Sequence, residues 1–465
     1  MWPAPDVRAA ALVCVLAATV AAQQTETFVA PDGTTFVLAP DPAMPLVHWA
    51  VATLVLDPPR YAGLSLATMR SSLAGTWTAG SVDADRERAA LDEQDRAWRA
   101  WAAAPGDASL LAQLVDRTQK AEGLGDRAAF RRVLAALPVH RPEIVDRYPA
   151  SVVVLSTVAE AIADVGRALV DRREHVALRN LHVVWPEIVV ERGLAQLGDP
   201  ATRVRAEVLA LAMPDHPFGR MLDVPETAMP PRDLAFATWQ TTQRPERTVH
   251  ALVGAFDPEA VKATLQQTFE ATALPPSEAP PPVVPRPVTS LRRSVVTGLP
   301  KPMVAIAFVL PPDLDRTLLT VTAHWLARGP ESCLGQDLLR KGRKTAKVRV
   351  EAPWPPTRNA AGMLLVEVED EAGVDKLADL VLQACRQVAV AEPTASALAA
   401  VIAAEQRERT ATANDPRAIA EALALDRLLF PKAPVTPFER VDPKAVLRVA
   451  TRIVSTQPII VEGRP

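Results

Sequence analysis

Hydrophobic positions along the chain alternate between two spacings, and each change of spacing marks the border of a predicted element. Residues 46–56 form an apolar run with the length of a strand buried on both faces, and residues 64–73 follow at helical spacing. A second strand followed by a helix is predicted at 247–269, where Asp257 and Pro258 mark the start of the helix. This order predicts a sheet with helices packed on one face.

A proline-rich stretch divides the chain into two halves. Its sequence Pro-Pro-Ser-Glu-Ala-Pro-Pro-Pro cannot hold a helix or an interior strand, which predicts a linker over 274–289. The halves are then 23–273 and 290–465, and the second repeats the order of strands and helices without repeating the sequence. The expected fold class is α+β, with two α/β sandwich halves, each a mainly antiparallel sheet with helices on one face.

Residues 81–136 differ in composition from the rest of the first half. They are charged and rich in alanine, and their apolar residues have the spacing of amphipathic helices. Pro105-Gly106-Asp107 separates two of these helices, which predicts a helical hairpin inserted into the first half. Trp98 and Trp101 fit the core of this hairpin better than a sugar-stacking platform.

Residues 1–22 have the pattern of an export signal. Arg8 precedes the apolar residues 9–22, and Val20-Ala21-Ala22 has the small residues of a cleavage site. The apolar run of about 14 residues is too short to span a bilayer. We therefore expect an exported chain, periplasmic or extracellular, without a stable membrane span after cleavage. A buried N-terminal helix is the alternative.

Charge and cysteine content restrict the function classes further. The chain has 51 basic and 54 acidic residues and a formal net charge of −3. It therefore has no net positive field to attract nucleic acid. After cleavage only Cys333 and Cys385 would remain, either as a disulfide or as two buried thiols. We favour the thiols, because a large core does not depend on one bridge.

The segment from Ala62 to Thr76 begins with Gly63-Leu64 and ends with Gly75-Thr76. It resembles the zinc-binding segment of the insulinase/pitrilysin metallopeptidases, in which His-x-x-Glu-His lies inside the frame Gly-Leu-x-His-x-x-Glu-His-x-x-x-x-Gly-Thr. Other stretches resemble the same family in the same order: 188–192 with 199–200, 214–220, 249–258, and 441–458. The resemblance implies the family's fold of two linked halves, as in its bacterial members.

The residues that the family uses for zinc are replaced in this chain. On the family's pattern the two histidines fall on Leu66 and Arg70, the general base on Met69, and the third ligand on Arg192. Leu66 has no donor atom and a thioether cannot act as a base, while the two arginines carry charges that repel a dication. Glu191 is the one candidate ligand, one residue from the expected position. We expect no bound zinc and no other cofactor.

Some relatives act as partners and supply an Arg and a Tyr from their second half to orient the substrate backbone. On that pattern these positions fall on Cys333 and about Ala346, so this pair is also replaced. The basic run 340–344 is either a solvated loop or a contact for an extended peptide or an acidic partner. His48, His140, His250 and His324 lack acidic or cysteine partners at ligand spacing. His175 and His182, seven residues apart, are too distant to share one metal without other ligands, and His216 lies in a polar turn. Ser71-Ser72 lacks the spacing of a serine hydrolase.

Together these observations predict a catalytically inactive insulinase-family homologue, a pseudoenzyme that is the non-catalytic subunit or peptide-binding partner of an active zinc metallopeptidase. Its partner would be an active subunit of the same family or a second copy of this chain. One alternative is an active zinc metalloendopeptidase with ligands that the sequence does not reveal. The other is a stand-alone peptide-binding or structural scaffold.

Overall fold

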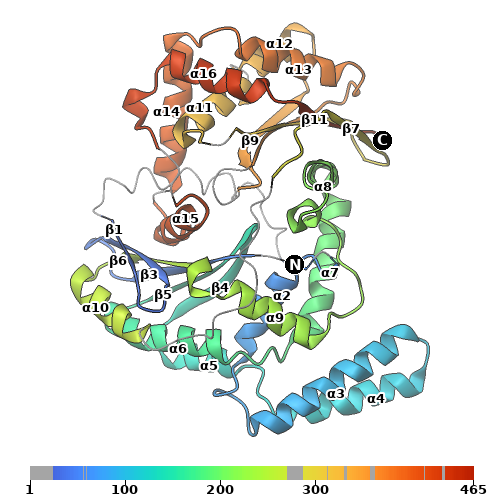
Figure 1. Ribbon diagram of the computed structural model, residues 1–465, viewed down its shortest axis with the longest axis vertical. Helices are drawn as coiled ribbons and strands as arrows, with labels where there is room; N and C mark the ends of the chain where they lie inside the picture. The colour runs from blue at the N-terminus through green and yellow to red at the C-terminus, as the bar shows by residue number, and fades with distance from the viewer. Residues whose placement is uncertain are drawn as a thin grey trace. The chain divides into compact units, whose positions relative to one another are not determined.

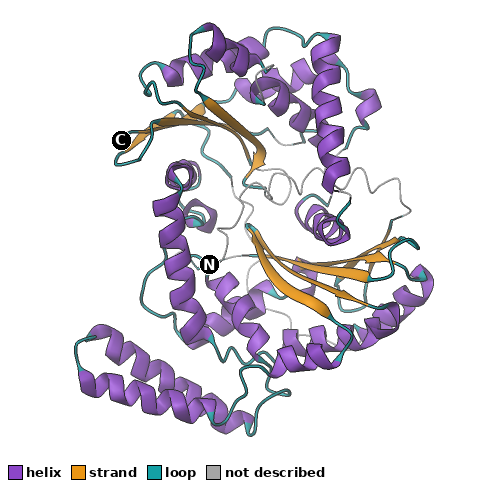
Figure 2. Cartoon of the chain, turned by 180° about the vertical axis from the view of Figure 1, so that it is seen from behind, coloured by secondary structure: helices purple, strands orange, loops and turns teal. Residues whose placement is uncertain are grey.

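The computed structural model describes residues 25–55, 57–58, 60–269, 286–311, 313–328, 332–356, 362–412, 414–431 and 435–465, with side chains omitted at 409–412. The expected export signal at 1–22 and residues 274–285 of the expected linker lie outside the described residues. The chain divides into an N-terminal unit, Gln23–Gly193 with Val224–Pro281, and a C-terminal unit that includes Leu194–Asp223 and Pro282–Pro465. Each unit contains one sheet with helices (Figures 1 and 2).

The sheet of the N-terminal unit has the strand order β1-β2-β6-β3-β5-β4. Its neighbouring strands run antiparallel, except β2 and β6, which run parallel. The strands are β1 (Glu26–Val29), β2 (Thr35–Pro40), β3 (Val47–Leu54), β4 (His140–Arg147), β5 (Ala150–Thr157) and β6 (Thr248–Gly254). The mainly antiparallel α+β architecture expected for this half is confirmed.

Helices α6 and α10 of the N-terminal unit lie on one face of this sheet and can be followed beneath the strands in Figure 1, whereas the α3–α4 hairpin projects away from the sheet. The helices of this unit are α2 (Leu64–Ser71), α3 (Ala84–Ala103), α4 (Ala108–Glu122), α5 (Ala129–Ala136), α6 (Ile162–Glu174), α9 (Arg232–Thr242) and α10 (Pro258–Thr268), together with α7 (Leu181–Gly198) as far as Gly193. Aromatic residues join helix to sheet: the Phe36 ring on β2 meets the Phe269 ring after α10 edge-on, at a centroid distance of 5.0 Å.

The sheet of the C-terminal unit has the order β7-β11-β8-β10-β9 and is also antiparallel, except for β7 and β11. Its strands are β7 (Arg292–Val296), β8 (Met303–Val309), β9 (Lys347–Trp354), β10 (Met363–Glu369) and β11 (Pro458–Gly463). Its helices are α8 (Pro200–Ala212), α11 (Arg316–Ala327), α12 (Cys333–Arg340), α13 (Leu377–Val388), α14 (Ala395–Thr412), α15 (Pro416–Leu429) and α16 (Pro443–Val454). No helix in the described part of the chain is long and apolar enough to cross a bilayer.

Helix α8 belongs to the C-terminal unit, although the sequence division places it in the half 23–273. Its Arg205 is buried and donates to Glu367 on β10 (Nε to Oε1, 2.8 Å) and to Glu351 on β9 (Nη2 to Oε1, 2.6 Å). Attraction to these carboxylates raises the pKa of Arg205 against the opposing effect of burial. The guanidinium therefore stays charged and ties α8 to this sheet.

The predicted hairpin insertion forms α3, α4 and the shorter α5, and two buried ion pairs attach it to the N-terminal unit. Arg179 donates to Glu87 (Nη2 to Oε2, 3.0 Å), and Arg232 donates to Asp95 (Nε to Oδ2, 2.7 Å). Both acidic residues lie on α3. At Gly125 a Cβ would come within 1.9 Å of Glu87 Oε1, so the chain needs glycine beside this pair. The base of the hairpin is therefore fixed to the unit.

Strand β4 is not evident from the hydrophobic pattern. Its first half is exposed and carries charged residues and Pro142, so it lacks the alternation of a half-buried strand. It pairs with β5 on one side and forms the edge of the sheet. The hydrophobic pattern does not predict this strand, because its position depends on pairing with β5 rather than on its own residues.

Two buried histidines are expected to make the fold sensitive to acid. Burial, reinforced by nearby arginines, lowers the pKa of His250 to about 3 and that of His182 to about 4. His250 Nδ1 accepts a hydrogen bond from Trp49 Nε1 (3.1 Å), which protonation would abolish. In the unfolded chain both side chains bind protons below about pH 6.5, whereas in the fold they stay neutral. Stability should therefore fall as pH decreases from about 6.5 towards 3–4, by up to about 1.4 kcal/mol per pH unit per histidine.

Denaturant unfolding measured from pH 7 to pH 4 checks this expectation. His250→Gln should reduce the slope of stability against pH, even if it lowers stability at pH 7. His140→Gln is the matched control, because His140 is exposed on β4. An unchanged slope in His250→Gln would contradict the assignment.

Candidate functional site

The first turn of α2 is held by a buried carboxylate. Asp57 accepts hydrogen bonds from the backbone N–H groups of Gly63 (2.6 Å) and Ser65 (2.7 Å). Burial raises the pKa of Asp57, and these two hydrogen bonds partly oppose the shift. Gly63 has a φ of 91°, and a Cβ there would come within 2.9 Å of the Ile188 side chain on α7. The glycine that begins the segment thus lets α2 approach α7 closely.

Leu66 and Met69, at the positions of the family's first histidine and general base, belong to the hydrophobic core. Their side chains are 4% and 2% exposed. Met69 Sδ accepts contacts from Arg172 Nη2 and Gln243 Nε2, both at 3.2 Å. Neither position presents a ligand or a base to solvent. The residue types at 66 and 69 predict that zinc ligation and general-base catalysis are lost here, whereas the contacts of Met69 with Arg172 and Gln243 are evident only in the structure.

Arg172 is a buried guanidinium whose hydrogen-bond partners are neutral. Its Nε donates to Ser72 Oγ (2.8 Å), and its Cζ lies 5.1 Å from the centre of the Trp239 ring. Burial lowers the pKa of Arg172 to about 10. The side chain therefore remains positively charged at neutral pH, directly beside position 69.

Arg70, at the position of the second histidine, forms an ion pair with Glu191 on α7. Arg70 Nη1 lies 2.8 Å from Glu191 Oε1, and the two side chains are 29% and 49% exposed. An ion pair this exposed contributes roughly 0–1 kcal/mol. Its main consequence is geometric: the carboxylate that faces α2 is Glu191, even though it is one residue from the position expected for a third ligand.

Arg192 points to a different set of residues. Its Nη2 lies 3.2 Å from Asp146 Oδ2 on β4, and its Cζ is 5.9 Å from the centre of the Tyr148 ring. Tyr148 donates in turn to Asp57 (3.3 Å), and burial raises the pKa of its hydroxyl well above the usual value. Arg192 therefore links α7 to the edge strand and to the residues around Asp57.

The residues around α2 do not fit a zinc ion. Among the described residues, no three His, Cys, Asp or Glu side chains gather as a metal site. A catalytic zinc needs three protein ligands and an open position. Here Glu191 is accompanied by Arg70, and Arg172 lies behind Met69. A dication would meet the Glu191 carboxylate, which is already paired with Arg70, and the positive charges of Arg70 and Arg172. No step of a metal-assisted reaction follows from these residues.

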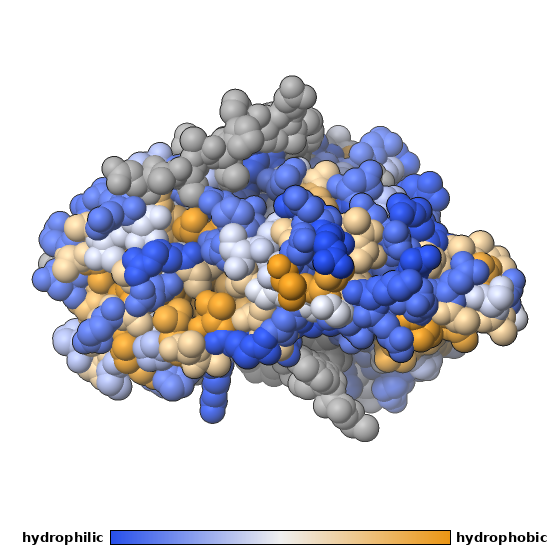
Figure 3. Space-filling view, turned by 90° about the horizontal axis from the view of Figure 1, so that it is seen from below, coloured by the Kyte–Doolittle hydropathy of each residue, from blue (hydrophilic) through white to orange (hydrophobic). Residues whose placement is uncertain are grey.

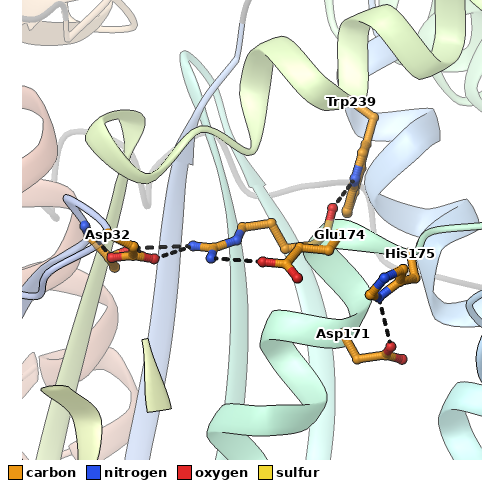
Figure 4. A network of polar contacts seen from close by, with 7 residues as sticks. Asp32, Asp171, Glu174, His175 and Trp239 are labelled. Atoms are coloured by element: carbon orange, nitrogen blue, oxygen red, sulfur yellow. Dashed lines mark hydrogen bonds and ion pairs between the residues drawn. The ribbon is translucent and has the colours of Figure 1, made fainter. Parts of the chain in front are cut away.

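The end of the segment, Gly75-Thr76, has a structural role. Gly75 has a φ of 126°, and a Cβ there would come within 2.1 Å of Arg179 Nη1. Arg179 Nη2 also donates to the Thr76 carbonyl (2.9 Å), and Thr76 Oγ1 donates to Asp171 (2.7 Å). Figure 4 shows that Asp171 also faces His175, at 3.0 Å from its Nδ1. Gly75 and Thr76 therefore serve packing and hydrogen bonding.

A second polar network joins the end of α6 to its surroundings. Arg173 Nη1 donates to Asp32 (2.9 Å), and its carbonyl accepts from Trp239 Nε1 (2.9 Å), as drawn in Figure 4. The Arg173 and Asp32 side chains are almost completely buried. This network holds α6, α9 and the turn before β2 together, and it is structural.

In the C-terminal unit, the positions expected for a substrate-orienting Arg and Tyr hold Cys333 and Ala346, which cannot orient a substrate backbone in the same way. Cys333 begins α12 as a free thiol, and burial raises its pKa to about 11. Ala346 packs against the hydrophobic core. Cys385 is also free, and burial raises its pKa to about 12. The nearby Arg343 of the basic run is engaged with Asp370 and is therefore not simply a solvated cation.

Comparisons with known proteins agree with this fold. Residues 236–404 match the family model described as the peptidase M16 inactive domain. No curated protein matches the chain. Many solved structures resemble it, and three of them match over 95% of its length. A protease from Helicobacter pylori has a TM-score of 0.71 and 11% identity and is covered over 100% of its chain.

The other two structures are each covered over 98% of their own length. An M16-like peptidase from Alicyclobacillus acidocaldarius has a TM-score of 0.58 and 13% identity. A peptidase M16 inactive domain from Pseudomonas fluorescens has a TM-score of 0.61 and 12% identity. At these identities the three structures establish similarity of fold.

Proposed function

We propose that this chain, a homologue of the insulinase/pitrilysin metallopeptidases, is the non-catalytic subunit of a complex with an active zinc metallopeptidase of the same family. The observation that carries the proposal is the content of α2. The positions for two histidines and a general base hold Leu66, Met69 and Arg70, of which the first two are core residues and the third is paired with Glu191.

The structure of the degenerate segment supports a scaffold role. The glycines that frame it are required by close contacts with Ile188 and Arg179, so the fold around the former site is maintained by packing. A chain that retains this architecture without ligands can provide part of an enclosure while the partner provides zinc. We propose that this happens outside the cytoplasm, because residues 1–22 have the pattern of an export signal.

Purification from the native cell tests the proposal. The chain, carrying a C-terminal tag, should co-purify with a protein that contains His-x-x-Glu-His and about one zinc per complex. The complex should cleave an unstructured peptide in a chelator-sensitive manner, whereas the recombinant chain alone should not. An untagged strain controls for unspecific capture. Purification of the tagged chain as a stable monomer, without any zinc-containing protein, would refute the proposal.

Peptide binding by a stand-alone scaffold is the second candidate. Strand β4 is an edge strand, so its outer backbone groups can pair with an extended peptide. Light scattering on the purified chain separates the two candidates: self-association without a zinc-bearing partner favours the scaffold.

The third reading is an active metalloendopeptidase. It requires about one zinc per isolated chain after dialysis, together with chelator-sensitive cleavage of a peptide.

A further inference from the structure

The segment from Arg340 to Arg349 concentrates positive charge at one edge of the second sheet. Its ten residues, Arg-Lys-Gly-Arg-Lys-Thr-Ala-Lys-Val-Arg, include six basic residues and no acidic one, whereas the whole chain has a formal net charge of −3. The segment runs from the end of α12 into the edge strand β9, and all of it belongs to the C-terminal unit. We call Lys341, Lys344, Lys347 and Arg349 the basic edge.

The carboxylates near the basic edge are already paired with other cations. On β10, Glu369 lies directly opposite Lys347, and Glu367 lies opposite Arg349. The pairs that occupy these and the neighbouring carboxylates are Glu369–Lys301, Glu367–Arg205, Glu351–Arg205, Asp337–Arg340 and Asp370–Arg343. In the described part of the chain, the four side chains of the basic edge are exposed and form no ion pair.

Two of the four charges also serve the fold. Lys341 lies at the end of α12, where a cation interacts favourably with the last carbonyls of the helix. Burial raises the pKa of Glu351, and the positive charge of Arg349 is one of the effects that oppose this shift. Lys344 and Lys347 have no such partner among the described residues. They are therefore the main source of uncompensated positive charge.

The loop that carries Lys344 is held in place by the arginine before it. Arg343 binds the Asp370 carboxylate and donates from Nη1 to the Gly373 carbonyl (3.0 Å). Lys344 follows directly, and β9 begins three residues later at Lys347. The cations thus lie on a backbone that is already fixed, so a ligand would not have to order it.

Strand β9 has β10 as its neighbour on one side and no described strand on the other. Val348 and Val350 pack against the core of the unit, so Lys347 and Arg349 point to the opposite face of the sheet. The outward backbone N–H and C=O groups of an edge strand can pair with an extended chain. Pro353 has no backbone N–H, so regular pairing would end before it, after about 20 Å.

The charges on β9 restrict which chain can pair there. Lysine on an edge strand deters pairing with a second copy of the same protein, because Lys347 and Arg349 would meet like charges. An acidic strand would instead be attracted. Apolar contact gives no alternative on the face drawn in Figure 3, where exposed hydrophobic residues form separate small groups among hydrophilic ones.

We propose that the basic edge binds an extended acidic segment of a partner protein, which adds to the sheet as a strand beside β9. The backbone of the segment would pair with β9, and its aspartate or glutamate side chains at every second position would lie beside Lys347 and Arg349. An acidic residue just beyond the strand would lie beside Lys344. This inference goes beyond the proposed function and does not depend on a zinc-bearing subunit.

Fluorescence anisotropy on the full chain, at low and at moderate salt, tests the proposal. The probe is a fluorescein-labelled nine-residue peptide in which glutamate alternates with threonine. One comparison peptide has lysine in place of each glutamate, and a second keeps the glutamates but has every internal backbone nitrogen methylated. The glutamate peptide should bind, with an affinity that falls as salt screens the charges. Both comparison peptides should bind at least about tenfold more weakly.

Variants locate the binding site. Lys344→Gln combined with Lys347→Gln should weaken binding of the glutamate peptide about fivefold or more at low salt, and less at moderate salt. Lys444→Gln combined with Arg448→Gln is the matched control. It removes the same charge from exposed positions of α16 and should change binding less than about twofold. Since all four side chains are exposed, circular dichroism should show an unchanged fold.

Four results would overturn the proposal. The first is no binding of the glutamate peptide, and the second is equal weakening by the two double variants. The third is undiminished binding of the methylated peptide, because the contact would then not be a strand. The fourth is equally tight binding of a single-stranded oligonucleotide of the same net charge, because the basic edge would then accept polyanions in general. Co-purification of a zinc-bearing subunit tests the proposed function separately, so the two proposals can fail independently.

Discussion

Replacing Leu66 and Arg70 together by histidine is expected to give a chain that retains about one zinc ion, whereas the parent chain is expected to retain none. Positions 66 and 70 lie one turn apart on α2, and the contact of Arg70 with Glu191 shows that position 70 reaches a carboxylate on α7. Two imidazoles and a carboxylate form a common zinc ligand set. The replacement also removes a fixed positive charge and releases Glu191 from its ion pair.

Metal content after dialysis against zinc-free buffer measures this effect. Arg70→His alone should retain little zinc, and adding Glu191→Gln to the double variant should remove it again. A folded double variant with no more zinc than the parent would contradict the geometry inferred for α2 and α7. Its fold should be checked by circular dichroism, since Leu66 is a core residue.

Adding Met69→Glu to that double variant should not restore hydrolysis. Arg172 Nη2 lies 3.2 Å from Met69 Sδ, so a glutamate at this position would form a buried ion pair with Arg172. A carboxylate held in this way is stabilised in its ionised form and is a weaker base towards a zinc-bound water. Chelator-sensitive peptide cleavage by the triple variant would show that Arg172 does not restrain position 69.

Replacing Arg179 by alanine is expected to lower the free energy of unfolding by about 3–5 kcal/mol. The change leaves Glu87, which is completely buried, without its cation and removes the donors to the carbonyls of Ala74, Thr76 and Ala79. The hairpin should then detach from the loop after α2 more readily. Urea unfolding and limited proteolysis within residues 84–122 measure both effects.

Arg117→Ala is the matched control for this prediction. Arg117 pairs with Glu93 at 2.8 Å, but the two side chains are 41% and 44% exposed, so its loss should cost no more than about 1 kcal/mol. Similar destabilisation by both variants would show that the buried pair does not fix the hairpin.

Elements that depend on neighbouring residues follow from the hydrophobic pattern of the sequence. The strand at 46–56 corresponds to β3, the helix at 64–73 to α2 with the turn after it, and the helix after Asp257 to α10. The prediction that α2 carries no zinc chemistry rests on residue type alone, because leucine and methionine lack the required donors. Strand β4 was not found, because its charged residues and Pro142 give no strand-like alternation.

The amino-acid sequence by itself determined the α+β class and is the basis for the prediction that the zinc-binding residues are replaced. Only the tertiary structure showed that Glu191 faces α2, that Arg172 lies beside Met69, and that α8 belongs with the second sheet. These contacts join residues separated by 121, 103 and 162 positions, in the pairs Arg70–Glu191, Arg172–Met69 and Arg205–Glu367. Local spacing sets the period of each element, whereas packing between distant elements sets the direction in which each side chain points.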